Sequence, residues 1–341
     1  SVWYYSVFFP VVEIIIAFAT ALMVWRGAHS VLQERATLGD INAFILYLSI
    51  LFRPLRMLAD KFNTLQMGVV SSDRIFKILD TNEHIENKGT YAPEHVQGNI
   101  EFKKVWFAYK DDNWVLKNVS FSIKPGETLA IVGATGAGKS SIINILNRFY
   151  EIQKGEILVE QTPVKQYELS ALRKQTGMVL QDVFLFSGSI FENITLRDSN
   201  VTREQVIHAA KMLGAHDFIM RLPGGYDYNV MERGATLSLG QRQLISFIRA
   251  LVFNPDILIL DEATSSVDTE TEQVIQHAIE NLITDRTSII IAHRLSTIRR
   301  ADQILVLDKG EVKEIGTHEE LLLHNGYYKK LYDMQFVKEL V

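Results

Sequence analysis

A short run of glycines, followed by a lysine and two serines, carries the clearest chemical signal in the sequence. Residues 133–140 read Gly-Ala-Thr-Gly-Ala-Gly-Lys-Ser and match the pattern GxxxxGK[ST]. Glycines let backbone N–H groups converge on phosphate oxygens, the lysine adds a positive charge, and the serine hydroxyl can ligate Mg²⁺. We therefore predict that ATP is bound by Gly133, Ala134, Thr135, Gly136, Ala137, Gly138, Lys139, Ser140 and Ser141.

Two carboxylates follow an apolar run at residues 257–260. A strand there would deliver Asp261 to the carboxyl edge of a parallel sheet, where it can hold Mg²⁺ through water. Glu262 would then orient or deprotonate the attacking water. Such a pair could equally lie at a surface edge, but the phosphate loop earlier in the chain favours a role in hydrolysis.

A third motif precedes these carboxylates. Residues 237–241 read Leu-Ser-Leu-Gly-Gln, and Ser238 is a suitable N-cap for a helix over residues 242–253. A bare Ser-x-Gly-Gln would be weak evidence of function. Its order and spacing relative to the other two motifs make it strong.

The motifs need strands and helices to position them. Short β-branched and apolar runs occur at residues 128–132, 257–260, 288–292 and 304–307, separated by helical segments and glycine turns. This alternation predicts a mainly parallel sheet covered by helices. One of these strands precedes the phosphate loop and a helical pattern follows it, as a phosphate-binding helix N-terminus requires.

The N-terminal part has a different composition. Residues 7–25 contain one charge, Glu13, and approach the ~20 residues needed to span a bilayer. Trp3, Tyr4, Tyr5 and Trp25 resemble interfacial anchors. The alternative is a buried helix of a soluble protein, although such helices seldom run this long without polar breaks.

A second apolar run, residues 41–52, continues with helical spacing to Leu79. One helix from Gly39 to about Asp80 would be ~60 Å long, about twice the hydrocarbon thickness. We expect it to cross the membrane and project into water. An excess of positive charge marks the cytoplasmic side, and cations gather after the second run at Arg53, Arg56, Lys61, Arg74 and Lys77.

These features predict three parts: two membrane helices in residues 1–80, a polar linker in residues 81–95, and a soluble α/β domain in residues 96–341. The net charge of −5 and pI of 6.0 argue against a nucleic-acid partner. The absence of cysteine excludes disulfides and Cys-ligated metals. The chain starts abruptly with Ser1 in an apolar stretch, so we interpret it as the C-terminal part of a longer protein.

The three motifs together resemble the ATP-binding cassette (ABC) family, specifically the exporters whose membrane and nucleotide domains are fused. The resemblance covers the whole chain, with residues 1–80 similar to the last two of six transmembrane helices. It implies an α/β P-loop NTPase (ABC ATPase) domain preceded by all-α transmembrane helices. ATP and Mg²⁺ would be the cofactors of an ATPase that drives export.

The resemblance also implies roles for further residues. Tyr109 matches the aromatic residue that stacks on adenine, and Gln181 matches the glutamine that reaches Mg²⁺ and water. His293 matches the switch histidine at the γ-phosphate, which makes Glu262, His293 and Gln181 the catalytic group. Ser140, Gln181 and Asp261 would hold the metal. Residues 232–234 resemble the loop that touches the coupling helices, and residues 265–268 the loop that crosses to the partner domain.

In this family two cassettes pack head to tail, so Ser238, Gly240 and Gln241 would bind the ATP of the other subunit. Residues 237–241 correspond to the signature motif of this family. Its third position is usually glycine, and here it is Leu239. A side chain at this close approach predicts poor hydrolysis in the site that uses it. This combination favours one subunit of a heterodimer with unequal sites. A homodimer that tolerates the substitution is the alternative.

The leading hypothesis is thus an exporter subunit in the cell membrane, multi-pass, with its nucleotide domain in the cytoplasm. Its partners would be a second half-transporter, the lipid bilayer and an exported drug, lipid or peptide. The alternative from another class is a soluble ABC ATPase acting on nucleic acid or ribosomes. The apolar residues 7–25 and the acidic balance argue against that alternative.

Overall fold

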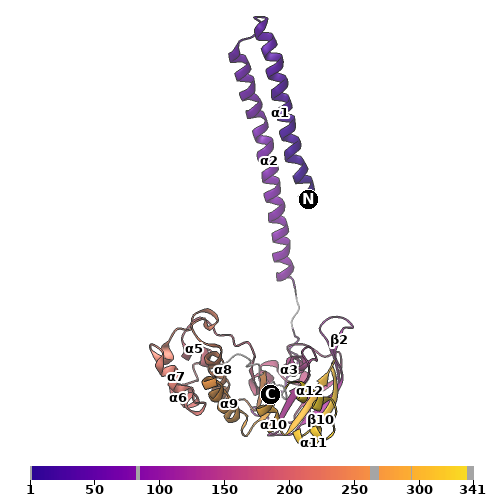
Figure 1. Ribbon diagram of the computed structural model, residues 1–341, viewed down its shortest axis with the longest axis vertical. Coiled ribbons are helices and arrows are strands. Elements are labelled where there is room, and N and C mark those ends of the chain that lie inside the picture. The colour runs from indigo at the N-terminus through magenta and orange to yellow at the C-terminus, as the bar shows by residue number, and fades with distance from the viewer. Residues whose placement is uncertain (1, 82–84, 262–268, 293, 336–341) are drawn as a thin grey trace. The chain divides into compact units, whose positions relative to one another are not determined.

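The chain divides into two compact units, Ser1–His84 and Ile85–Val341. The computed structural model describes residues 2–81, 85–261, 269–292 and 294–335 (Figure 1). The predicted fold class is confirmed, because a helical unit precedes an α/β unit that holds the phosphate loop. The second unit begins at Ile85, so it includes the second part of the predicted linker.

The first unit consists of two long helices that pack side by side, α1 (Val2–Leu32) and α2 (Leu38–Leu79) (Figure 1). Thr37 and Asp40 form a capping box at the start of α2, in which Asp40 accepts from the Thr37 N–H at 2.8 Å. A Cβ on Gly27 of α1 would lie 2.8 Å from Ile41 Cγ1 of α2, so this glycine permits the close approach of the helices.

Within the described residues, one stretch is long and apolar enough to cross a membrane, Pro10–Leu32. It overlaps the predicted first span. The predicted single helix from Gly39 to Asp80 is present as α2, but its apolar run is only residues 41–52, and Arg53 follows directly. The second membrane span therefore remains a prediction, since this run is shorter than the ~20 residues that a span needs.

The second unit contains two sheets. The larger has the order β10-β9-β3-β8-β7-β6, and its strands are parallel except for β10. Its strands are β3 (Thr128–Val132), β6 (Thr176–Val179), β7 (Ile257–Asp261), β8 (Thr287–Ile291), β9 (Gln303–Asp308) and β10 (Glu311–Gly316). The smaller antiparallel sheet, absent from the sequence prediction, has the order β2-β1-β4-β5 and comprises β1 (Ile100–Ala108), β2 (Trp114–Ile123), β4 (Lys154–Val159) and β5 (Thr162–Pro163).

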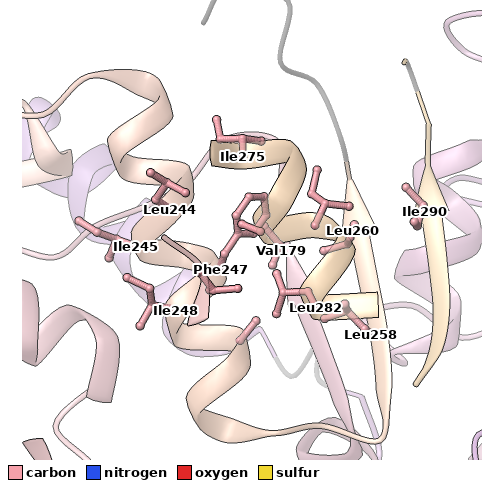
Figure 2. Close-up of a cluster of buried hydrophobic side chains, with 14 of the residues drawn as sticks. Val179, Leu244, Ile245, Phe247, Ile248, Leu258, Leu260, Ile275, Leu282 and Ile290 are labelled. Atoms are coloured by element: carbon pink, nitrogen blue, oxygen red, sulfur yellow. The ribbon is translucent and has the colours of Figure 1, made fainter. Parts of the chain in front are cut away.

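Helices cover the larger sheet and make two hydrophobic clusters with it. In one cluster, Phe247 of α8 (Leu239–Phe253), Leu282 of α9 (Thr269–Ile283) and Leu260 of β7 are buried together (Figure 2). The other cluster joins the two sheets through α3 (Lys139–Leu146). The remaining helices are α4 (Leu169–Gln175), α5 (Ile190–Thr195), α6 (Arg203–Met212), α7 (His216–Arg221), α10 (Leu295–Arg300), α11 (His318–Leu323) and α12 (Tyr327–Gln335), with 3-10 turns η1 (Val164–Gln166), η2 (Gly225–Asp227) and η3 (Glu232–Gly234).

Candidate nucleotide site

The phosphate loop connects β3 to the N-terminus of α3. Gly138 is the N-cap of α3 and has a φ of 103°, in the left-handed region that favours glycine. A Cβ on Gly133 would lie 2.1 Å from the Leu307 carbonyl oxygen of β9, so the loop is packed directly against the neighbouring strand. Ala134, Thr135, Gly136 and Ser140 are exposed, whereas Ala137 and Ser141 are buried. The loop therefore presents one open face above a helix N-terminus, which suits an anion.

Lys139 is buried, with 8 % of its surface exposed, and its ammonium turns back onto the loop. Lys139 Nζ donates to the carbonyl oxygens of Gly133 at 2.8 Å and Ala134 at 3.1 Å. Burial lowers the pKa of Lys139, and the negative charge of Asp261 partly opposes this effect. The ammonium is thus held inside the loop, where phosphate oxygens could replace the two carbonyl partners.

Asp261 lies at the same edge of the sheet as the loop. It is the last residue of β7 and pairs with Ile291 of β8, which in turn pairs with Ile131 of β3. Because these strands are parallel, their carboxyl ends meet at one edge. The structure therefore brings Asp261 and the phosphate loop together, as the sequence predicted.

The other predicted catalytic residues follow strands that end at this edge. Gln181 is exposed, two positions after Val179, the last residue of β6. Glu262 follows Asp261, and His293 follows β8, but both lie outside the described residues, as do residues 265–268. Their roles in hydrolysis remain predictions that rest on the sequence.

Tyr109, predicted to stack on adenine, is half-exposed beside α3. Its hydroxyl lies 3.1 Å from Ser141 Oγ and accepts from the Asn144 amide at 3.2 Å. Its ring makes an edge-on contact with Tyr150, with centroids 4.8 Å apart. Asn144 and Tyr150 were not singled out from the sequence, although Asn144 is one helical turn beyond Ser140 and so on the same face of α3.

The signature residues begin α8 in another part of this unit (Figure 1). Ser238 is the N-cap, and its hydroxyl accepts from the Gln241 N–H at 3.3 Å while its own N–H donates to Gln241 Oε1 at 3.0 Å. Gly240 is buried and Leu239, the first helical residue, is half-buried. Ser238 and Gln241 thus shape a helix N-terminus, and Leu239 occupies its first turn.

The residues present fit Mg²⁺ bound together with a nucleotide. Ser140 is exposed at the start of α3, and Asp261 ends β7 in the sheet whose strand β3 leads into the phosphate loop. Mg²⁺ commonly takes one or two protein ligands and completes its shell with water and phosphate oxygens. Among the described residues, no cluster of three or more His, Cys, Asp or Glu side chains could hold a metal by itself, and none is required for this mode of binding.

Comparison with known proteins agrees with this geometry. Residues 116–265 match the family described as ABC transporter. An uncharacterized ABC transporter ATP-binding protein of Bacillus subtilis, YknV, is 46 % identical over 97 % of this chain and 55 % of its own length. An ATP-dependent lipid A-core flippase of Haemophilus influenzae is 44 % identical over 96 % of this chain and 56 % of its own length. The chain spans about half the length of these curated relatives.

A solved structure is also similar to this chain. A bacterial Atm1-family ABC exporter with ATP bound superposes with a TM-score of 0.71 at 40 % identity, over 96 % of this chain and 57 % of that chain. The similarity includes both the α/β unit and the helical unit, because almost the whole of this chain is covered.

Proposed function

Because this chain belongs to the ABC transporter family, we propose that it forms the ATP-hydrolysing part of an exporter. The observation that carries the proposal is the shared sheet edge, because the phosphate loop with Lys139 follows β3 and Asp261 ends β7 in the same set of parallel strands. The helical unit with its candidate span, Pro10–Leu32, supports a membrane protein.

The loop residues bind the triphosphate in this proposal. Lys139 exchanges its bonds to the Gly133 and Ala134 carbonyls for phosphate oxygens, and the N-terminus of α3 adds N–H donors. Ser140, Gln181 and Asp261 hold Mg²⁺, which neutralises phosphate charge. Glu262 orients the attacking water, His293 contacts the γ-phosphate, and Tyr109 stacks on adenine.

A second cassette completes the site. We propose that Ser238, Gly240 and Gln241 bind the ATP held by a partner subunit, and that the partner's signature covers the phosphate loop of this chain. Leu239 adds a side chain to the first turn of α8, where a phosphate must approach the backbone. A heterodimer with one weak site follows from this substitution. High Glu262-dependent ATP hydrolysis by the full-length chain alone would contradict it.

The proposed location is the cell membrane, multi-pass, with the α/β unit in the cytoplasm. The exported molecule would be a drug, lipid or peptide. The lipid A-core flippase among the relatives makes a lipid the first candidate to test. A panel of such compounds should stimulate ATP hydrolysis by the full-length complex if one of them is the cargo.

Substitutions of Lys139 and Glu262 test the ATPase proposal directly. In the full-length transporter in lipid nanodiscs, K139A should lower ATP hydrolysis about 100-fold, because a preorganised charge at the phosphates is removed. E262Q should bind ATP and trap it without turnover. The matched control is K124A, since Lys124 is an exposed lysine that forms an ion pair with the nearby Glu127. Unchanged hydrolysis in E262Q would remove Glu262 from the catalytic role.

A further inference from the structure

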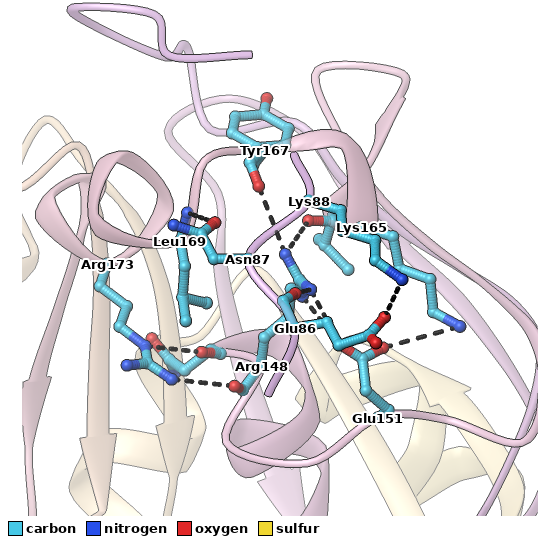
Figure 3. Close-up of polar contacts among 11 residues, drawn as sticks. Glu86, Asn87, Lys88, Arg148, Glu151, Lys165, Tyr167, Leu169 and Arg173 are labelled. Atoms are coloured by element: carbon cyan, nitrogen blue, oxygen red, sulfur yellow. Dashed lines mark hydrogen bonds and ion pairs between the residues drawn. The ribbon is translucent and has the colours of Figure 1, made fainter. Parts of the chain in front are cut away.

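Arg148 lies just beyond the C-terminus of the phosphate-loop helix α3, and its guanidinium makes five hydrogen bonds (Figure 3). Two go to Glu151 Oε1, at 2.9 and 3.1 Å. The others go to the carbonyl oxygens of Glu86 at 3.0 Å and of Val164 and Tyr167 at 3.3 Å. Five is the full donor capacity of an arginine.

This network is centred on a buried side chain and joins segments far apart in the sequence. The side chain of Arg148 is 4 % exposed. Its carbonyl partners belong to the segment at residues 86–95, which we name the connector, and to the turn around η1. A lysine offers only three donors from one point, so it could not serve these acceptors together.

The connector has further attachments to the same turn. The Asn87 amide donates to Glu168 Oε1 at 2.9 Å. Asn87 Oδ1 accepts from the Leu169 N–H at 2.9 Å (Figure 3). Tyr91 pairs with Gln166 and Glu168 through backbone bonds of 3.0 and 2.9 Å. The connector is therefore fixed to the α/β unit, a few residues after the end of α2 in the chain.

The segment that carries Arg148 also contacts the nucleotide side. Tyr150 packs edge-on against Tyr109, and the Tyr109 hydroxyl accepts a hydrogen bond from Asn144 of α3. The Asn147 side chain bonds both α3, at the Ile143 carbonyl, and Thr176 of β6. A short helix moves as a unit, so a shift at its phosphate end reaches Arg148.

From these contacts we infer that Arg148 is a positioning residue that links nucleotide occupancy at the phosphate loop to the connector, and so to the chain entering from α2. The inference rests on the proposed nucleotide binding. Arg148 is the link because the same side chain holds the connector carbonyl and extends from the backbone that ends α3. Its role is to transmit movement, and it touches no reacting atom.

Hydrogen–deuterium exchange of the full-length transporter in nanodiscs tests the link. Adding Mg²⁺ and the non-hydrolysable analogue AMP-PNP should slow exchange in the peptide covering residues 86–95 about fivefold, as expected if nucleotide strengthens hydrogen bonds that limit local opening. In R148M this nucleotide effect should disappear, and R148K should restore only part of it.

R173M is the matched control. Arg173 also bonds this end of α3, but its hydrogen bonds go to the Asn147 and Arg148 carbonyls rather than to the connector, and its guanidinium lies over Phe149. R173M should therefore keep the nucleotide effect. If R148M does not fold, N87A serves in its place. This substitution removes the hydrogen bond between Asn87 of the connector and Glu168, and because Asn87 is exposed it leaves no buried charge. N87A should reduce the nucleotide effect.

Two results would overturn the inference. One is an unchanged exchange rate in the connector peptide of the wild type, while AMP-PNP slows exchange in the phosphate-loop peptide. The other is a full nucleotide effect in R148M. Failure of the proposed function gives a different result. AMP-PNP would then leave exchange in the phosphate-loop peptide unchanged, which would overturn both the proposed nucleotide binding and the inference about Arg148.

Discussion

At the scale of single residues, Glu168 illustrates a side chain whose charge is fixed by its hydrogen bonds. It accepts from the Ala171 N–H at 2.7 Å as the N-cap of α4, and from the Ser170 hydroxyl and the Asn87 amide. These bonds, that from Ser170 first, lower the pKa of Glu168 to about 2, from 4.5. One carboxylate thus joins a helix start to the connector.

The pH dependence of stability follows from this lowered pKa. A carboxylate with a depressed folded-state pKa stabilises the fold above its unfolded pKa of 4.5, and this contribution is lost as pH falls toward 2. E168Q should therefore melt below the wild type at pH 6, and the difference should shrink steadily between pH 5 and about pH 2. Differential scanning fluorimetry in a pH series measures this. A constant difference across the series would show that charge is not involved.

The position of the phosphate loop and of Asp261 in the fold could be predicted from the sequence, whereas the connector network could not. Lys139 and Asp261 belong to motifs whose spacing already carries the chemistry, so their placement at one sheet edge was expected. Arg148 and Asn87 act on backbone groups that are distant in the chain. No local pattern marks such partners, because they are brought together only by the folded unit.

At the scale of elements, the phosphate loop depends on glycine where it touches other strands. Gly133 has a φ of 154° and its missing Cβ would lie 2.1 Å from Leu307 O, whereas Gly136 has a φ of 81° with nothing within 4 Å. G133A should thus destabilise the α/β unit by about 3 kcal/mol and weaken AMP-PNP binding. G136A should lower the free energy of unfolding by only about 1 kcal/mol, because the added Cβ meets no neighbouring atom and only backbone strain from the positive φ is introduced.

The two variants form a matched pair that separates packing from backbone strain. Chemical denaturation monitored by tryptophan fluorescence gives the two stabilities, and calorimetry gives the AMP-PNP affinities. Equal losses of stability in G133A and G136A would show that contact between the loop and β9 does not matter, leaving the positive φ as the only requirement.

The strands show why element prediction was partial. The parallel strands β3, β7 and β8 are continuous buried runs and were recognised as such. In β1 the alternation is interrupted at Lys103 and Lys104, where the pairing register also shifts and Lys104 has a φ of 47°. A bulge of this kind removes the period-two pattern on which strand prediction depends.

At the scale of the whole molecule, composition predicts a linker at residues 81–95, whereas the second compact unit begins at Ile85. Residues 81–95 are polar and contain Gly89 and Pro93, which is typical of a linker. A Cβ on Gly89 would lie 1.9 Å from the Tyr167 carbonyl oxygen, so this glycine allows backbone-to-backbone packing. Within residues 85–95, the Asn87 side chain, the Tyr91 backbone and the Glu94 carbonyl are hydrogen-bonded to the rest of the α/β unit, and polarity alone does not distinguish this state from exposure to solvent.

Two truncations locate the boundary. A fragment of residues 85–341 should be more stable than one of residues 96–341 by about 4 kcal/mol, because the shorter fragment loses several hydrogen bonds and leaves buried donors unpaired. The donors affected are Arg148, which loses the Glu86 carbonyl, and Gln175, which loses the carbonyls of Pro93 and Glu94. Urea denaturation of both fragments measures the difference. Matching circular dichroism spectra serve as the control that both retain the fold, and equal midpoints would place the boundary at Val96, as composition first indicated.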